Sequence, residues 1–174
     1  MSAVRTASLL FAVVMTVSSA CERGRGAPEA SARQQQFELG VSRVQVTVPA
    51  GWEALDQGRQ KRFRKGEFEI VLQNLGPATP PSDELETLIE WGLTAVGHDQ
   101  RREVKTRRTI TIDGREAVDI ETWSRLDHTN PQRILLAKDA RDLLALHTER
   151  MALQDSLAAF DAIRDSFHFV SARR

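Results

Sequence analysis

Apolar and polar residues alternate along much of the chain after residue 36, which predicts a domain rich in β-strands. Residues 43–48 carry valine at every second position, and residues 67–73 alternate in the same way. This is the pattern of a strand with one buried face. Residues 60–65 are predicted to form the hairpin partner of the second of these strands.

A second group of strands is predicted in the C-terminal half. Residues 104–112 and 116–123 flank Asp113-Gly114, a dipeptide that favours a tight hairpin turn. Two further segments, 133–138 and 143–150, are apolar on both faces. Central strands that are covered on both sides have this composition.

Two stretches have apolar residues at helical spacing. The first begins after Ser82, a suitable N-cap, and stops at Gly97. The second begins at Asp155 or Ser156 and is predicted to end at His168, where a partly charged imidazole would suit the negative end of the helix dipole. The order of three strands, a helix, four strands and a helix predicts an α+β domain. We expect a mostly antiparallel sheet of about six to seven strands packed with two helices.

Three local features resemble a known family. They are Val48-Pro49-Ala50-Gly51-Trp52 after the first strand, the meander that follows Asp113-Gly114, and the closing sequence Asp165-Ser166-Phe167-His168-Phe169. Together they resemble the PsbP-like group of small bacterial envelope proteins, which includes the DcrB-like lipoproteins. The resemblance covers nearly all of the domain and implies an α/β/α sandwich. It also implies a binding or assembly role without catalysis, and it carries no catalytic residues to this chain.

The N-terminus has the organisation of a secretory signal peptide. Arg5 precedes an apolar stretch at residues 7–17, which is too short to span a bilayer. Small residues close this stretch at Ser18-Ser19-Ala20, directly before Cys21. We therefore expect residues 1–20 to be a signal peptide that is cleaved between Ala20 and Cys21, and the protein to be exported to the cell envelope.

Cys21 is the only cysteine of the chain, so it cannot form an internal disulfide. Its position after small residues resembles that of the lipidated cysteine of bacterial lipoproteins, although Ser18 stands where such signals usually carry an aliphatic residue. The alternative is ordinary signal-peptidase cleavage at the same bond. We expect a lipid on Cys21 that anchors the protein to a membrane, facing the periplasm. Glu22, in place of the aspartate that often signals inner-membrane retention, favours the outer membrane.

The rest of the chain is predicted to form one domain. Residues 21–36 lack aliphatic and aromatic side chains after the cysteine, which predicts a flexible tether. Residues 37–170 are enough for a single domain with a core, and residues 171–174 are expected to be disordered. The formal net charge is zero, which gives no reason to expect nucleic acid as a partner.

Candidate chemistry is sparse. His147 and Glu149 lie two residues apart on a predicted strand, so their side chains share a face. A zinc or acid–base role is one interpretation, and a half-exposed structural face is the other. No metal-ligand spacing, nucleophile motif or phosphate loop appears in the sequence. We therefore expect no catalytic residues, no metal and no cofactor.

Two sets of residues are candidates for contact with a partner. Asp119, Glu121 and Trp123 alternate on one face of a predicted strand, and this face is expected to point outward. Basic residues gather at 59–65 and 101–108; they are interpreted as solvated edge strands, with an acidic partner or anionic lipid as the alternative.

Two functions remain open. The first is a non-catalytic module that binds or assembles another envelope protein through the sheet face or the loop at 76–81. The second is a small hydrolase or ligand-binding domain, which a deep pocket lined by His147 and Glu149 would favour.

Overall fold

The computed structural model describes residues 31–77, 85–98, 101–126, 131–139, 142–149 and 154–170. The predicted signal peptide, the Ala20–Cys21 bond, most of the tether, most of the loop at 76–81 and the tail at 171–174 lie outside these ranges. In the described part of the chain, no helix has the length and apolar character needed to cross a membrane.

The described elements follow one another as five strands, a helix, four strands, a helix and a last short strand. The helices are α1 (Leu85–Ala95) and α2 (Gln154–Asp165). The strands are β1 (Arg33–Leu39), β2 (Ser42–Val48), β3 (Glu53–Gln57), β4 (Gln60–Lys65), β5 (Phe68–Pro77), β6 (Arg102–Ile112), β7 (Arg115–Ser124), β8 (Gln132–Asp139), β9 (Asp142–Glu149) and β10 (His168–Phe169).

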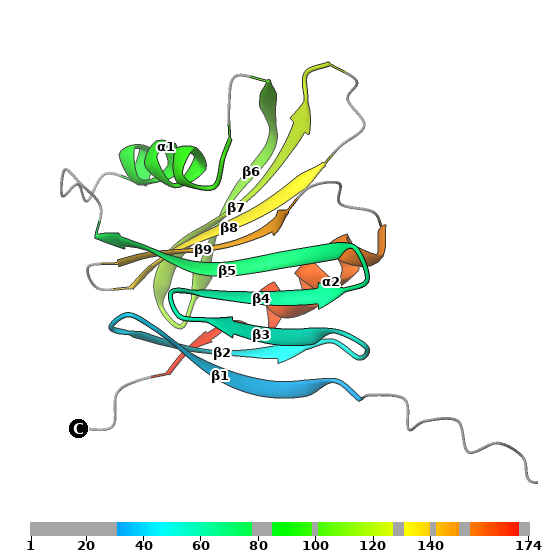
Figure 1. The fold of residues 1–174 in the computed structure, drawn as a ribbon. Helices are drawn as coiled ribbons and strands as arrows, with labels where there is room; N and C mark the ends of the chain where they lie inside the picture. The colour runs from blue at the N-terminus through cyan, green and yellow to red at the C-terminus, as the bar shows by residue number, and fades with distance from the viewer. Residues whose placement is uncertain are drawn as a thin grey trace, which may run out of the picture.

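The strands form two antiparallel sheets. The larger sheet has seven strands in the order β3-β4-β5-β9-β8-β7-β6, and the smaller has the order β1-β2-β10. Helix α1 lies on one side of the large sheet, and α2 lies on the other side together with the small sheet (Figure 1). The α+β class and the sandwich of helices around an antiparallel sheet are confirmed.

Each face of the large sheet has its own hydrophobic core. On one face, Ile89 and Leu93 of α1 pack against apolar residues of β7, β8 and β9. On the other face, Phe160 and Ile163 of α2 are fully buried together with the inner face of β1 and β2. Strands β8 and β9 contribute to both cores, as their apolar sequences predict.

Two local features hold the strands in place, a hairpin turn and a side chain that joins the two sheets. Asp113 and Gly114 both have positive φ, 50° and 77°, as a two-residue type I′ hairpin turn requires. At a second point, Asn74 ties the two sheets together. Its Nδ2 donates to the Leu39 carbonyl of the small sheet at 2.7 Å and to Asp142 of the large sheet at 2.6 Å.

Three strands were not predicted. Strand β1 begins at Arg33, so residues 33–36 belong to the domain and the predicted tether is four residues too long at its C-terminal end. Residues 33–36 pair with β2 through the backbone, and Gln36 also donates to Gln45, so they need no apolar side chain to be ordered. The other two strands are β3 and β10.

The predicted end of the second helix is also corrected. Helix α2 ends at Asp165, and His168 lies in β10 instead of capping the helix. The strand is favoured because β10 pairs with β2, and because His168 Nδ1 lies 3.1 Å from Asp113 Oδ1.

Candidate functional site

Asp119, Glu121 and Trp123 alternate along β7, and their side chains share the face of the large sheet that α2 covers. Asp119 pairs in register with Leu135, a residue of the α2-side core, so its side chain points to that side. Asp119 is only 4% exposed. The alternation was predicted correctly, but the expectation that Asp119 faces solvent is wrong, because α2 and long arginine side chains cover it.

Three arginines from three different elements surround the Asp119 carboxylate. Arg133 of β8 donates to both of its oxygens at 3.1 and 3.0 Å, and Arg164 of α2 donates to Oδ2 at 3.0 Å. Arg108 of β6 adds a contact of 3.2 Å from the more exposed side. Charge-assisted hydrogen bonds of this kind are stronger than neutral ones.

Acidic residues of α2 balance these arginines. Asp161 lies 2.9 Å from Arg164 and 3.4 Å from Arg133, and Asp165 lies 2.8 Å from Arg164. Burial alone would lower the pKa of Arg164, but the neighbouring carboxylates, led by Asp165, outweigh it and raise the pKa above its ordinary value. Three positive and three negative groups cancel, so this cluster locks α2 to the sheet and does not form an anion site.

Glu121 and Trp123 remain the accessible part of the predicted surface. Both are half-buried, and Trp123 Nε1 donates to Glu121 Oε1 at 2.5 Å. The indole therefore has a satisfied polar end and a partly uncovered ring. Amphipathic aromatic side chains of this kind are enriched at protein interfaces.

His147 lies on the opposite face of the sheet, on the side of α1. It is 4% exposed, and its Nε2 is 3.2 Å from Gln73 Nε2, while Nδ1 is buried without a hydrogen-bond partner. Burial lowers the pKa of His147 to about 4, so the imidazole is neutral at physiological pH.

A polar network continues from Gln73 along this face. Gln60 donates to Gln73 at 2.8 Å and accepts from Arg62 at 3.1 Å. Arg62 in turn reaches Glu69 at 2.9 Å and Glu149 at 3.4 Å. The hydrogen bond to Glu69 is the main cause that raises the pKa of Arg62.

This network holds both His147 and Glu149 in contacts with neighbouring side chains. Glu149 is held by Arg62, and His147 is enclosed next to Gln73. Within the described residues, no group of three or more histidine, cysteine or acidic side chains is placed to hold a metal ion. The shared face was predicted correctly, but it is not half-exposed at His147, which is 4% exposed.

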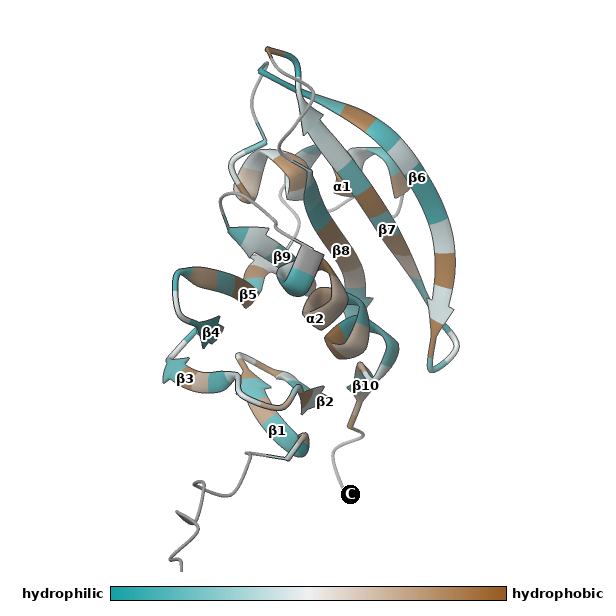
Figure 2. Cartoon of the chain, turned by 90° about the vertical axis from the view of Figure 1, so that its right-hand side faces the viewer, coloured by the Kyte–Doolittle hydropathy of each residue, from teal (hydrophilic) through white to brown (hydrophobic). Residues whose placement is uncertain are grey.

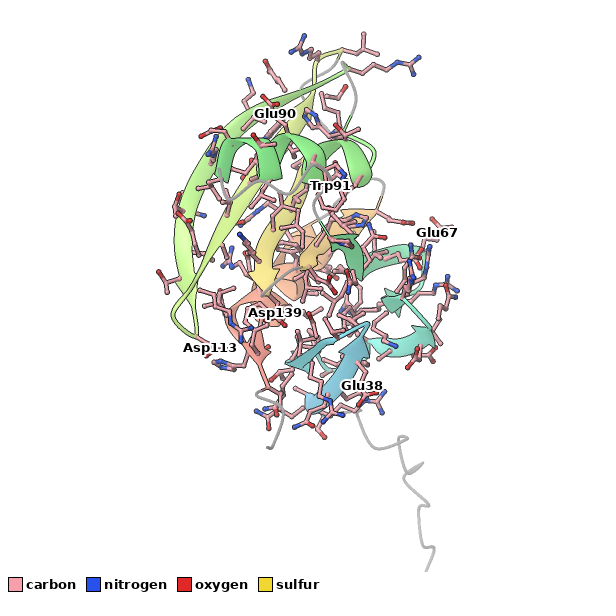
Figure 3. All side chains as sticks on the ribbon, turned by 90° about the vertical axis from the view of Figure 1, so that its left-hand side faces the viewer. Glu38, Glu67, Glu90, Trp91, Asp113 and Asp139 are labelled. Carbon is pink, nitrogen blue, oxygen red and sulfur yellow. The ribbon has the colours of Figure 1, made fainter. Side chains whose placement is uncertain are left out.

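A surface hollow of about 230 Å³ lies elsewhere, between the end of β6, the end of α2 and β10. Asp113, at the tip of the β6–β7 hairpin (Figure 3), is one of the residues that line it. Its carboxylate accepts from the Phe169 amide at 2.6 Å and contacts His168, which together hold its pKa below the usual range. The residues that line the hollow are Ile110, Thr111, Ile112, Asp113, Arg164, Asp165, Phe167 and His168.

The two basic segments do not merge into one patch. In the first, Lys61 is buried and pairs with Asp56, and Arg62 joins the network around Glu69. In the second, three of the four cations of β6 contact a carboxylate, and the fourth, Arg102, donates to Thr122 Oγ1 at 3.0 Å. The three ion pairs are Lys105–Glu103, Arg107–Glu86 and Arg108–Asp119.

Comparison with known proteins places this geometry in a known fold. No protein-family model matches the chain, and no curated protein matches its sequence. Among solved structures, the solution structure of cyanobacterial PsbP (CyanoP) from Synechocystis sp. PCC 6803 is similar, with a TM-score of 0.58 and 17% identity. The match covers 84% of this chain and 96% of that one. The chain has a PsbP-like fold. At this identity the likeness extends to the fold alone.

The arginine cluster around Asp119 was not predicted from the sequence. Arg133 and Arg164 lie 14 and 45 residues from Asp119, and no local spacing links them. A buried acidic residue between Val118 and Ile120 was the available signal, since both neighbours face the α1 core and leave Asp119 to face α2.

Replacement of Asp119 by asparagine should destabilise the domain strongly. Asp119→Asn keeps the shape of the side chain but removes the charge that the buried arginines require, and we expect a loss of about 3 kcal/mol. Urea unfolding of both proteins at neutral pH measures this loss in the free energy of unfolding. Glu86→Gln, which removes the carboxylate of the exposed pair with Arg107, should cost much less; equal losses would show that the Asp119 cluster is solvated.

A second measurement concerns His147. Its pKa is about 4 in the folded protein against an ordinary value of 6.5, so the folded state binds fewer protons between these values. Stability should be constant above pH 6.5 with respect to this group and fall as the pH drops towards 4, by about 3 kcal/mol in total. Urea unfolding of the parent and of His147→Gln at pH 7 and pH 4.5 should show a smaller drop for the variant. An equal drop in both proteins would contradict the buried neutral imidazole.

Proposed function

We propose that this protein is an exported, non-catalytic binding or assembly module, held at an envelope membrane by a lipid on Cys21. The observation that carries the proposal is where the polar side chains lie. The groups able to do acid–base chemistry, Asp119 and His147, are enclosed within the domain, whereas Glu121 and Trp123 are partly open on a sheet face. Enclosed polar groups and a partly open tryptophan suit recognition of another protein better than catalysis.

The module would meet its partner on the face of β7 that carries Trp123. The uncovered part of the indole offers apolar area, and Glu121 fixes its orientation through the 2.5 Å hydrogen bond. A preorganised aromatic side chain loses little entropy on binding, which is why tryptophan dominates many interfaces. The partner is proposed to be another envelope protein.

A ligand-binding domain is the second candidate function. The hollow beside Asp113 supports it, because it combines apolar residues with the polar side chains of Arg164 and His168. Both polar side chains already have carboxylate partners, at Asp119 and Asp113 respectively. A small ligand would have to displace one of these pairs, so a protein partner is the stronger proposal.

Removal of the proposed lipid site tests the anchoring. Cys21→Ala should move the protein from the membrane fraction to the soluble fraction and abolish incorporation of a labelled fatty acid, because acyl chains supply the membrane affinity. Ser31→Ala, outside the proposed signal and before β1, should change neither result. Persistent label on the Cys21→Ala protein would refute lipidation at this residue.

Site-specific photocrosslinking in cells tests the binding role. A photoreactive phenylalanine at Trp123 should give one protein adduct of defined mass, whereas the same group at Trp91 on α1 should not give that adduct. Both positions are half-buried tryptophans, so they are matched in exposure. Identical adducts from both positions, or none from Trp123, would argue against a specific partner at this face.

A further inference from the structure

Strand β6 is the outer strand of the large sheet and the longest strand described, with 11 residues. It pairs with β7 on one side, and no strand in the described part of the chain pairs with its other side. Its outer edge follows the right-hand border of the molecule in Figure 2. An uncovered edge presents backbone donors and acceptors to solvent, which makes it a template for another strand.

The part of this edge that can accept a strand is limited at both ends. At one end, the register between β6 and β7 shifts between Val104 and Thr106, and such a bulge twists an edge away from pairing. At the other end, β6 stops at Ile112 and the hairpin turn begins at Asp113. The register with β7 is regular between these ends. The segment 106–112 is long enough for a strand of common length.

The hairpin turn determines which residues of β6 point their backbone groups outward. Ile112 and Arg115 flank the two-residue turn and are paired in register. In a type I′ hairpin this flanking pair exchanges both N–H···O bonds, and along an antiparallel pair such residues alternate with residues whose backbone groups point away. Arg107, Thr109 and Thr111 therefore present their N–H and C=O groups to the open side.

A second copy of the same segment pairs fully with this edge in one register. The two-fold axis of such a pair must lie at a residue, because outward backbone groups of one copy have to meet outward groups of the other. An axis at Arg107 or Arg108 would place like charges directly opposite each other, which is destabilising. An axis closer to the turn than Thr109 leaves part of the segment unpaired. An axis at Thr109 pairs the whole segment, and the opposed residues are then Thr106–Ile112, Arg107–Thr111, Arg108–Ile110 and Thr109–Thr109.

The charges beside the edge fit a second copy in this register. The hollow described above is lined by Ile110 and by the carboxylates of Asp113 and Asp165. Arg108 of the second copy would stand opposite Ile110, on the face of the sheet where the hollow lies. The Arg108 side chain is 65% exposed, so it is free to reach the acidic side of the hollow. Two-fold symmetry makes this contact twice, once in each direction.

The contact leaves the existing ion pairs in place. Arg108 is one of three arginines that contact Asp119, so that carboxylate keeps two buried partners if Arg108 turns outward. Arg107 holds Glu86 on the other face of the sheet. The residue opposite Arg107 is Thr111, which brings no charge to compete for it.

We infer that two copies of this chain associate by antiparallel pairing of β6 over residues 106–112, with the two-fold axis at Thr109 and with Arg108 of each copy directed to the acidic hollow of the other. The two large sheets then form one continuous sheet. Trp123 is paired in register with Glu103, on the far side of the bulge, so the proposed partner face lies outside this contact. The inference goes beyond the proposed binding role, and neither depends on the other.

Cysteine crosslinking of the full chain in cells tests both the contact and its register. In a pair centred on Thr109, the Cα atoms of the two Thr109 residues lie about 5.5 Å apart, which a disulfide can span. After treatment with a mild oxidant, Thr109→Cys should run as a disulfide-linked dimer on a non-reducing gel. Mass spectrometry should find residue 109 joined to residue 109.

Thr111→Cys is the matched control for this crosslink. Thr111 is also an exposed threonine of β6, but its two copies would be offset by four residues, or about 14 Å along the strand. This variant and the parent, which has Cys21 as its only cysteine, should stay monomeric on the same gel. A monomeric Thr109→Cys protein, or an equal yield of dimer from Thr111→Cys, would overturn the inference.

Opposite charges at Thr109 distinguish a second copy from a charged partner of another kind. Thr109→Lys and Thr109→Glu each place like charges across the axis, so both should weaken the dimer about two- to five-fold in sedimentation equilibrium of the purified chain. An equal mixture of the two variants should restore the dimer, because lysine then stands opposite glutamate. A parent that stays monomeric, variants that change the affinity in opposite directions, or a mixture that associates no better than either variant would each refute the pairing.

Discussion

The apolar character of β8 and β9 on both faces is the constraint from which the rest of the architecture follows. Leu135 and Leu146 point to one core, whereas Ile134 and Ala145 point to the other. Each face must therefore be covered, because leaving such strands open to water would forfeit about 25 cal/mol per Å² of apolar surface. Helix α1 covers one face. The other face needs α2 and the small sheet together, and so the first and last strands of the domain are brought to the same side.

Polar groups within this sandwich are tolerated only where their charges or hydrogen bonds are met. Asp119 faces α2 from a central position, and guanidinium groups from the adjacent strands and from the helix neutralise it. On the opposite face, His147 avoids the cost of burial by staying neutral. The two sites thus solve the same problem in different ways, one by pairing and one by deprotonation. In both sites the state of the side chain, charged and paired or neutral, is what allows it to be buried.

Much of the fold followed from local patterns. Three features could be predicted because each depends on neighbours in sequence. They are the period of the strands, the Asp113-Gly114 turn, and the apolar residues on both faces of β8 and β9. Strands β1 and β10 could not be predicted in this way. In β1, polar residues such as Gln34 and Gln35 are ordered by backbone pairing with β2 and not by burial. The arginines that contact Asp119 could not be predicted for a related reason. Alternation tells which residues share a face, but only the packing of α2 tells what covers that face.

The hydrogen bond from the Thr47 amide to Ser166 Oγ joins residues 119 positions apart, and β10 pairs with β2 over a similar separation. Closing loops of that length costs entropy before any contact compensates for it, and contacts distant in sequence slow folding. Ser166 and β10 come after all the other described elements, so they are synthesised after them. The small sheet, with the side of the α2 core that it covers, can therefore be completed only once the last element of the domain has been made. Until then the domain stays incomplete, although all seven strands of the large sheet are already present in the chain.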